Sequence, residues 1–241
     1  MLDFKRRSRW ASTRYFVLSQ CLGICLLWLF FVHPAAAEWT GGIEGGTVVR
    51  DTGNATRLRL VLRNSTRPLS QYLYAEWLNS GSERNSYSVG YNPRYWLNDT
   101  YYTFGESRFR VDEALNIDQE IELLAGMGGQ FLTNAQQSLY VELGVGGRSI
   151  GFDGFEDALN EALGVVRLGY FRSFADTVKF DLSADGGLSS EDVTEANGEI
   201  GLSLRIPNGA IRVAYRSRYL QVGDQESLTD NDSFVSFGYS F

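Results

Sequence analysis

Apolar and polar residues alternate along most of the chain after residue 37. The segment TRLRLVLRNS, residues 56–65, sets leucines on one side against arginines on the other. The final segment, DNDSFVSFGYSF, places Val235, Phe237, Tyr239 and Phe241 at every second position. A period of two is the mark of a β-strand with one apolar face. The pattern predicts an all-β fold.

About twelve such segments follow one another. A soluble antiparallel sandwich would also alternate. These segments, however, run for eight to thirteen residues, which is longer than the usual strand of about five or six. Their polar faces carry arginine mixed with acidic residues, as expected for a barrel with an apolar outside and a polar inside. The predicted strands begin near Trp39, Ala55, Gln71, Ser86, Thr100, Asn116, Gln137, Asn160, Thr177, Ala196, Ala210 and Asn231.

The connections between these segments alternate in length. RPLS, LND, TNAQ, FAD and PNG are short, whereas NSGSERN, VDEALN, GFDGFEDALNEA, SSEDVTEA and GDQESLTDN are longer. Short periplasmic turns and longer outer loops are typical of bacterial outer-membrane barrels, and an even strand number places both ends of the chain on one side. The sequence therefore predicts a transmembrane antiparallel up-and-down β-barrel, without a long inward plug.

The first 37 residues resemble a signal peptide. A basic start, MLDFKRRSRWASTR, precedes an apolar run and the small residues AAA, which is the order of a secretory leader with its cleavage site. We place the cleavage after Ala37, so that residues 1–37 are the leader and residues 38–241 the barrel. The alternative is an uncleaved anchor, since about 18 apolar residues can just span a bilayer. The leader predicts export to the bacterial outer membrane.

Removal of the leader changes the chemistry that the chain can support. Both cysteines and the single histidine lie in residues 1–37. Taking five basic residues and one acidic residue of the leader from totals of 22 and 29 leaves 17 and 28, a net charge of −11. This sign argues against a nucleic-acid partner. Without histidine or cysteine we expect no metal site, no cofactor and none of the histidine-dependent hydrolytic dyads.

Two further groups are catalytic candidates. A Ser–Lys pair around Lys179 is formally open, but pairing of Lys179 with Asp181 is the better interpretation. Glu120 and Glu122 share one face and could act as acid and base, although a role as ion-pair partners of arginines is favoured. The sequence predicts a protein that is not an enzyme.

The polar faces define a predicted lumen. Because arginine pairs bidentately with carboxylates, these groups suit packed ion networks. The lumen candidates are Arg59, Arg108, Arg110, Glu120, Glu122, Glu142, Arg148, Arg212, Arg216 and Arg218, with Arg57, Arg63, Glu106, Asp112, Arg167, Lys179, Asp181, Glu199 and Arg205 on the same faces. Basic residues are somewhat ahead in this set. It predicts either a structural, envelope-stress barrel with narrow conductance or a porin-like channel for small solutes, preferably anions.

Two other features predict partners. The longer connections are acidic and could gather the divalent cations that bridge lipopolysaccharide, or could simply be solvated; their acidic residues are Asp153, Glu156, Asp157, Glu191, Asp192, Glu195, Asp224, Glu226 and Asp230. At the C-terminus, Phe237, Tyr239 and Phe241 face lipid in this register. They resemble the signal that barrel-assembly machinery recognises in its clients.

Several stretches resemble one family. EWTGGIEGGTVVRDTGN is similar to the opening hairpin of the salt-induced outer-membrane protein family, domain of unknown function 481. RFRVDEALNIDQEIELLAGMGGQFLTNAQQSLYVELGVGGR resembles its central stretch, and DNDSFVSFGYSF its closing strand. The resemblance covers the chain after the leader. It implies an outer-membrane barrel and supplies no activity or catalytic residues.

Overall fold

A computed structural model describes residues 39–50, 53–79, 85–134, 136–154, 157–174, 177–207, 209–223 and 226–240. The predicted leader, the cleavage site after Ala37 and the terminal Phe241 lie outside these residues. The strands are β1 (Trp39–Arg50), β2 (Gly53–Asn64), β3 (Leu69–Asn79), β4 (Ser86–Trp96), β5 (Tyr101–Asp112), β6 (Ile117–Phe131), β7 (Gln137–Phe152), β8 (Leu159–Ser173), β9 (Val178–Ser189), β10 (Val193–Ile206), β11 (Gly209–Val222) and β12 (Leu228–Ser240), with a 3-10 helix η1 (Glu113–Leu115).

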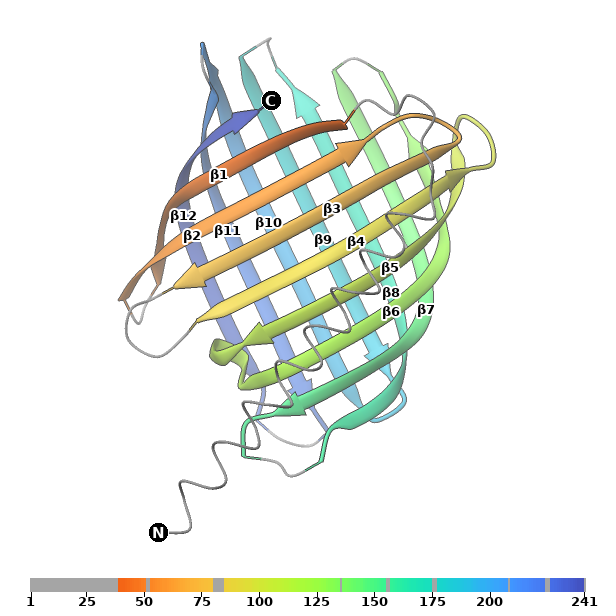
Figure 1. The fold of residues 1–241 in the computed structure, drawn as a ribbon, viewed down its shortest axis with the longest axis vertical. Coiled ribbons are helices and arrows are strands. Elements are labelled where there is room, and N and C mark those ends of the chain that lie inside the picture. The colour runs from red at the N-terminus through yellow and green to blue at the C-terminus, as the bar shows by residue number, and fades with distance from the viewer. Residues whose placement is uncertain are drawn as a thin grey trace. The chain divides into compact units, whose positions relative to one another are not determined.

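The strands form one closed antiparallel barrel. Each strand pairs with its neighbours in sequence, and β12 returns to β1, where Gly42 faces Ser240 and Val49 faces Ser233. The strands wrap obliquely around the lumen (Figure 1). Closure satisfies every edge, which is what a sheet in lipid requires, because bilayer hydrocarbon offers backbone groups no hydrogen bonds. The predicted fold class is confirmed. In the described part of the chain no helix is long and apolar enough to cross a bilayer.

The connections differ from the expectation. Strands β8, β10 and β12 start at Leu159, Val193 and Leu228, inside segments that were predicted as long loops. Only residues 190–192 separate β9 from β10. The acidic residues at these strand ends face the polar lumen. In the sequence they cannot be distinguished from the polar residues of a solvent-exposed loop. We call the end of the barrel that carries η1 the η1 end, and the end where β1 starts and β12 finishes the terminal end.

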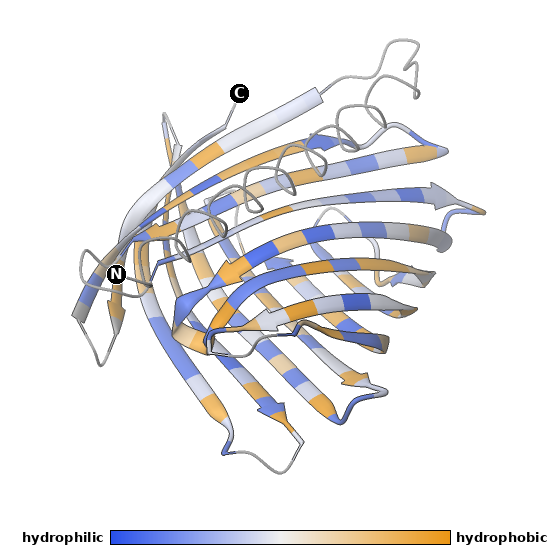
Figure 2. Cartoon of the chain, turned by 60° about the horizontal axis from the view of Figure 1, so that its bottom comes forward, coloured by the Kyte–Doolittle hydropathy of each residue, from blue (hydrophilic) through white to orange (hydrophobic). Residues whose placement is uncertain are grey.

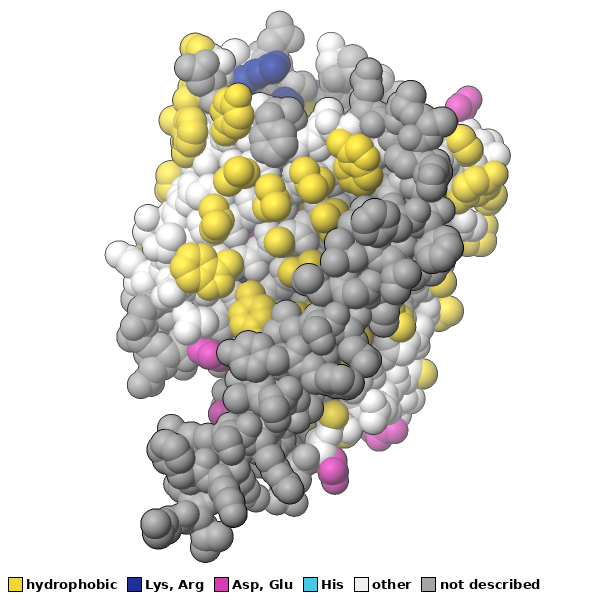
Figure 3. All heavy atoms as spheres, in the orientation of Figure 1, with side chains coloured by type: hydrophobic (Ala, Val, Ile, Leu, Met, Phe, Trp, Pro, Cys, Tyr) yellow, Lys and Arg dark blue, Asp and Glu magenta, His cyan; other side chains and the backbone are white. Residues whose placement is uncertain are grey.

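The outer wall is apolar and has aromatic residues at one rim. Polar and apolar positions alternate along the strands (Figure 2), and apolar side chains dot the visible outer wall (Figure 3). The aromatic residues gather at the terminal end, where short turns join the strands. Those with exposed side chains are Trp39, Tyr95, Tyr101, Phe131, Phe174 and Tyr239. Aromatic rings at the level of the lipid headgroups form the girdles of outer-membrane barrels.

Inward-facing glycines make room for aromatic rings that lie against the inner wall. A Cβ at Gly128 would stand 2.5 Å from the ring of Tyr102. At Gly169 it would collide with the ring of Tyr140, and at Gly90 with that of Tyr74. Each glycine stands directly opposite its aromatic partner on the neighbouring strand. Gly128 belongs to GMGGQ, and its packing agrees with the predicted role of those glycines, which is relief of crowding on a barrel wall.

Candidate functional site: the lumen

The structure places the predicted lumen candidates on the inner wall. Many of their guanidinium and carboxylate groups pair with groups from other strands, as Arg108 of β5 does with its cross-strand neighbour Glu122 of β6 at 2.9 Å. Buried members include Arg110, Glu142 and Arg148. Arg63 differs, because it is exposed at the terminal end and stacks on Tyr72, with its Cζ atom 5.2 Å from the ring centroid.

The sequence predicts only half of the acidic residues of this lumen. Glu161, Glu195 and Asp230 were assigned to loops or left out, yet they lie in β8, β10 and β12 and pair with arginines. Other inward residues that were not predicted are Glu44, Glu76, Arg94, Asp185 and Asp232. The expectation of a basic excess is therefore wrong for the lumen as a whole, where acidic residues match the arginines. The alternation of polar and apolar residues in β8 continues back to Leu159. Following it to that residue would have identified Glu161 as an inward residue.

A layer of ion pairs crosses the interior near the η1 end. Glu195 on β10 binds two arginines, with its Oε1 2.7 Å from Nη1 of Arg110 on β5 and its Oε2 2.6 Å from Nη1 of Arg148 on β7. Arg110 also reaches Glu120 at 2.6 Å. Strand β10 lies five positions from β5 around the barrel. Side chains from opposite walls therefore meet in the middle of the lumen.

Further ion pairs between strands that are not neighbours lie closer to the terminal end. Arg216 on β11 lies 2.7 Å from Glu76 on β3, four strands away. Arg167 on β8 donates two hydrogen bonds, of 2.6 and 2.9 Å, to Glu106 on β5. Such bidentate pairs are the strongest form of the interaction. Together these contacts hold walls that are not neighbours in the sheet.

An apolar cluster covers the ion pairs at the η1 end. Leu115 of η1 is 1% exposed and packs with buried residues from β6, β7, β10 and β11, namely Ile117, Ile150, Val193 and Leu220. Phe152, Leu159, Val222 and Leu228 pack around this cluster. We call Leu115 and these eight residues the apolar cap. The described residues form no long inward plug; a one-turn helix and the strand ends fill this end instead.

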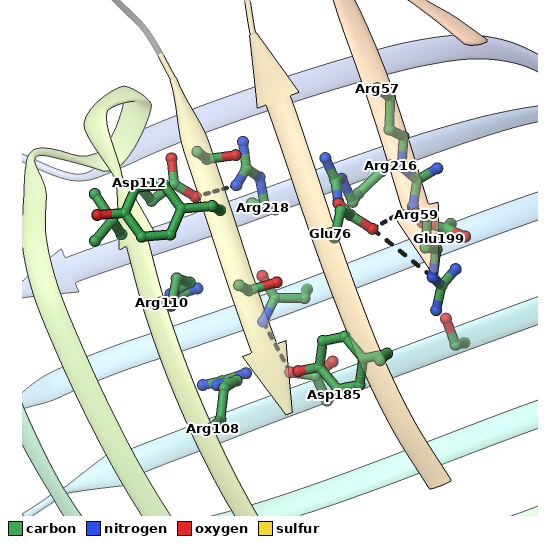
Figure 4. Close-up of a pocket in the computed structure, with 17 residues that line it drawn as sticks. Arg57, Arg59, Glu76, Arg108, Arg110, Asp112, Asp185, Glu199, Arg216 and Arg218 are labelled. Atoms are coloured by element: carbon green, nitrogen blue, oxygen red, sulfur yellow. Dashed lines mark hydrogen bonds and ion pairs between the residues drawn. The ribbon is translucent and has the colours of Figure 1, made fainter. Parts of the chain in front are cut away.

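The lumen also holds a cavity of about 260 Å³, which Arg110 of the ion-pair layer lines. Six arginines and four carboxylates line it, and Figure 4 shows these groups reaching toward one another from several strands. The charged residues are Arg57, Arg59, Arg108, Arg110, Arg216, Arg218, Glu76, Asp112, Asp185 and Glu199. Arg57 is almost fully buried, with its Cζ 4.1 Å from the centroid of the Phe234 ring. We call this space the central cavity.

The groups weighed for catalysis are engaged in ion pairs or separated. Glu120 and Glu122 both accept hydrogen bonds from Nη2 of Arg108, at 3.0 and 2.9 Å. Asp181, the expected partner of Lys179, is bound by Arg212. Among the described residues no group of three His, Cys, Asp or Glu side chains is arranged to hold a metal ion.

The chain is similar to proteins of unknown function. The family described as "Protein of unknown function, DUF481" matches residues 59–241. The uncharacterized protein YdiY of Escherichia coli (strain K12) is 30% identical over 169 residues, which are 67% of this chain and 65% of that protein. This chain thus spans just under two thirds of its curated relative.

Solved structures share the fold at low sequence identity. The NanC porin superposes with a TM-score of 0.55 at 10% identity, covering 83% of this chain and 98% of that one. The KdgM porin gives 0.52 at 11% identity, with 83% and 99% covered. An outer membrane channel from Pseudomonas putida F1 gives 0.52 at 9% identity, with 86% and 97% covered. These matches identify the architecture as that of an outer-membrane β-barrel.

Proposed function

Because this chain belongs to the DUF481 family and closes into an outer-membrane β-barrel, we propose that it is an exported, non-enzymatic envelope barrel whose outer end is closed and which conducts at most narrowly. The observation that carries this proposal is the contact between Arg218 on β11 and Asp112 on β5. These strands lie six positions apart in either direction around the barrel. A side-chain contact between opposite walls leaves little room for solute at that level.

Two features indicate the orientation of the barrel in the membrane: the even number of strands and the position of the aromatic residues. A chain delivered from the periplasm starts and ends on the periplasmic side when its strand number is even. The aromatic rim also lies at the terminal end, beside Tyr239 and Phe237, which face outward at 54% and 49% exposure. The η1 end with its apolar cap then faces the cell exterior. Residues 1–37 supply the export signal, and outer-membrane lipid with lipopolysaccharide surrounds the apolar wall.

The energetics favour a closed resting state. Desolvated arginine–carboxylate pairs are costly to separate, because each freed charge would stay buried without a partner. Opening the layer around Glu195 would release two guanidinium groups at once. The apolar cap adds a second barrier, since a dry hydrophobic constriction blocks ions by excluding water.

Planar-bilayer recording tests this proposal. Protein isolated from outer membranes of cells that express the full chain should insert and give no current, or only small brief openings. The double variant Asp112→Asn with Arg218→Gln should conduct more, because neutral amides no longer hold the two walls together. Large steady currents from the wild type would contradict a closed barrel and would favour the alternative, a small-solute channel, for which the arginines of the central cavity argue.

The non-enzymatic part has its own test. Glu120 and Glu122 are both held by Arg108, so neither is placed as a free acid or base. The detergent-solubilised barrel should not release fatty acid or headgroup from phospholipid or lipopolysaccharide. Measured lipid turnover that Glu120→Gln abolishes would overturn this part and leave the closed-barrel proposal standing.

A further inference from the structure

A second cavity lies inside the lumen at the terminal end. It measures about 300 Å³ and is lined by residues of β1, β2, β9, β10, β11 and β12. Its charged residues are Arg59, Lys179, Arg205 and Glu44. Three cations thus face one carboxylate. We call this cavity the basic vestibule.

Two of the three cations of the basic vestibule, Lys179 and Arg205, lack the carboxylate partners that other lumen cations have, whereas Arg59 lies 3.9 Å from Glu76. Within the residues that the structure describes, no carboxylate lies within ion-pair distance of Lys179 or Arg205. The acid closest to Lys179 in sequence on the same face, Asp181, is taken by Arg212. The ammonium nitrogen of Lys179 lies 5.8 Å from the centroid of the Phe171 ring. Both cations are exposed to the lumen and available to a ligand.

The single acid of the basic vestibule is already engaged. Glu44 accepts a hydrogen bond from the hydroxyl of Ser236 and is the cross-strand neighbour of Arg59. On the facing wall, Ser203 pairs in register with Lys179, and Arg205 follows two residues later on the same face. A hydroxyl donor therefore stands between two cationic donors. This arrangement offers an ammonium, a hydroxyl and a guanidinium to one ligand.

Arg59 also lines the central cavity. It stands between the two spaces, with its Nη2 3.1 Å from the hydroxyl of Tyr72. Since the η1 end is filled by the apolar cap, a ligand reaches the basic vestibule from the terminal end. The wall around it is of low dielectric, which strengthens and focuses the field of the unpaired cations.

We propose that the basic vestibule binds small oxyanions, carboxylates or phosphates, through Lys179, Arg205 and Arg59. Charge-assisted hydrogen bonds from ammonium and guanidinium groups are the usual means of holding such anions. A cavity of this size is at the small end of ligand pockets, which suits phosphate or a short carboxylic acid. The proposal needs the barrel but not conduction, so it can fail or hold independently of the closed-barrel proposal.

Calorimetric titration of the detergent-solubilised wild-type barrel with inorganic phosphate, and separately with acetate, tests the site. Chloride at matched ionic strength serves as the background. We expect saturable binding of phosphate. The double variant Lys179→Gln with Arg205→Gln should weaken it at least tenfold, because one hydrogen bond to a charged group contributes enough for that factor. Arg172→Gln is the control, since Arg172 is exposed near the same end but does not line the cavity.

A variant of opposite sign sharpens the test. Glu44→Gln removes the only carboxylate of the basic vestibule and should tighten phosphate binding severalfold. Each variant must first show wild-type heat-modifiable migration, which reports a folded barrel. Absence of saturable binding, or equal binding by the wild type and the double variant, would overturn the site. Binding of short-chain phosphatidylglycerol without binding of phosphate would also overturn it, because the ligand would then be a lipid headgroup.

Discussion

Arg218 of β11 donates hydrogen bonds to Asp112 of β5 and to Asp230 of β12. The first partner stands on the opposite wall and the second on the adjacent strand. Asp112 is fully buried and Arg218 is 6% exposed, so the contact is removed from water. One guanidinium group thereby ties the end of the β5 strand, just before η1, to the far side of the barrel.

Replacing this arginine should destabilise the barrel. Arg218→Gln removes the cation that contacts Asp112 and Asp230, and breaking a buried ion pair from one side costs about 3–5 kcal/mol. Urea unfolding in phospholipid vesicles measures the loss of unfolding free energy. Arg67→Gln is the matched control: Arg67 pairs with the exposed Asp99 at 2.8 Å, and exposed pairs contribute about 0–1 kcal/mol. Equal losses in the two variants would contradict a structural role for the cross-lumen contact.

The apolar cap should control both stability and closure. Leu115→Ala removes the central side chain of the cluster, which is 1% exposed, and truncation of a buried leucine costs about 2–5 kcal/mol. The variant should also open more often in planar bilayers, because water can enter the gap. Leu123→Ala, at a lipid-facing position that is 60% exposed, should change neither property by a comparable amount. A cap variant that is destabilised yet stays electrically silent would show that the ion-pair layer alone closes the lumen.

Glycines that carry aromatic rings should not tolerate a methyl group. Gly169→Ala would drive its Cβ into the ring of Tyr140, so folded barrel should be lost in heat-modifiable electrophoresis after mild heating. Gly198→Ala is the control, because nothing lies within 4 Å of its added Cβ. Adding Tyr140→Leu to the Gly169→Ala variant should restore part of the loss. If the double variant is no better than the single, the collision with Tyr140 is not the cause.

The C-terminal aromatic residues should matter for assembly. Deletion of Phe241 should lower the fraction of chain that reaches the outer membrane as folded barrel, since Val235, Phe237 and Tyr239 form an outward row and the sequence alternation predicts Phe241 as its last member. Phe241→Trp preserves an aromatic end and should assemble normally. Membrane fractionation with protease protection measures the outcome. Normal assembly of the deletion variant would contradict an assembly signal at this residue.

Much of the fold can be predicted from residues that are close together in the sequence. Strict alternation in segments such as residues 56–65 predicts the strands, because a strand in lipid must place apolar residues outward at every second position. The same parity identifies Arg59, Arg110 and Glu120 as inward without any knowledge of their partners. Even strand number and the closing aromatic strand follow from the same pattern. These features depend on neighbours two residues apart, which a sequence displays directly.

The tertiary structure alone decided which inward charges meet and where the lumen closes. Glu195 binds Arg110 from a strand five positions away, and such pairings depend on the register of every intervening strand. Leu115 reads as part of a loop, yet the barrel's closure brings strand ends from both halves of the chain around it. Acids at strand ends were mistaken for loop residues because polarity marks both solvent and lumen. The alternation of residues therefore determined the strands of the wall and which side chains face inward. Closure of the barrel decided which of these side chains contact one another.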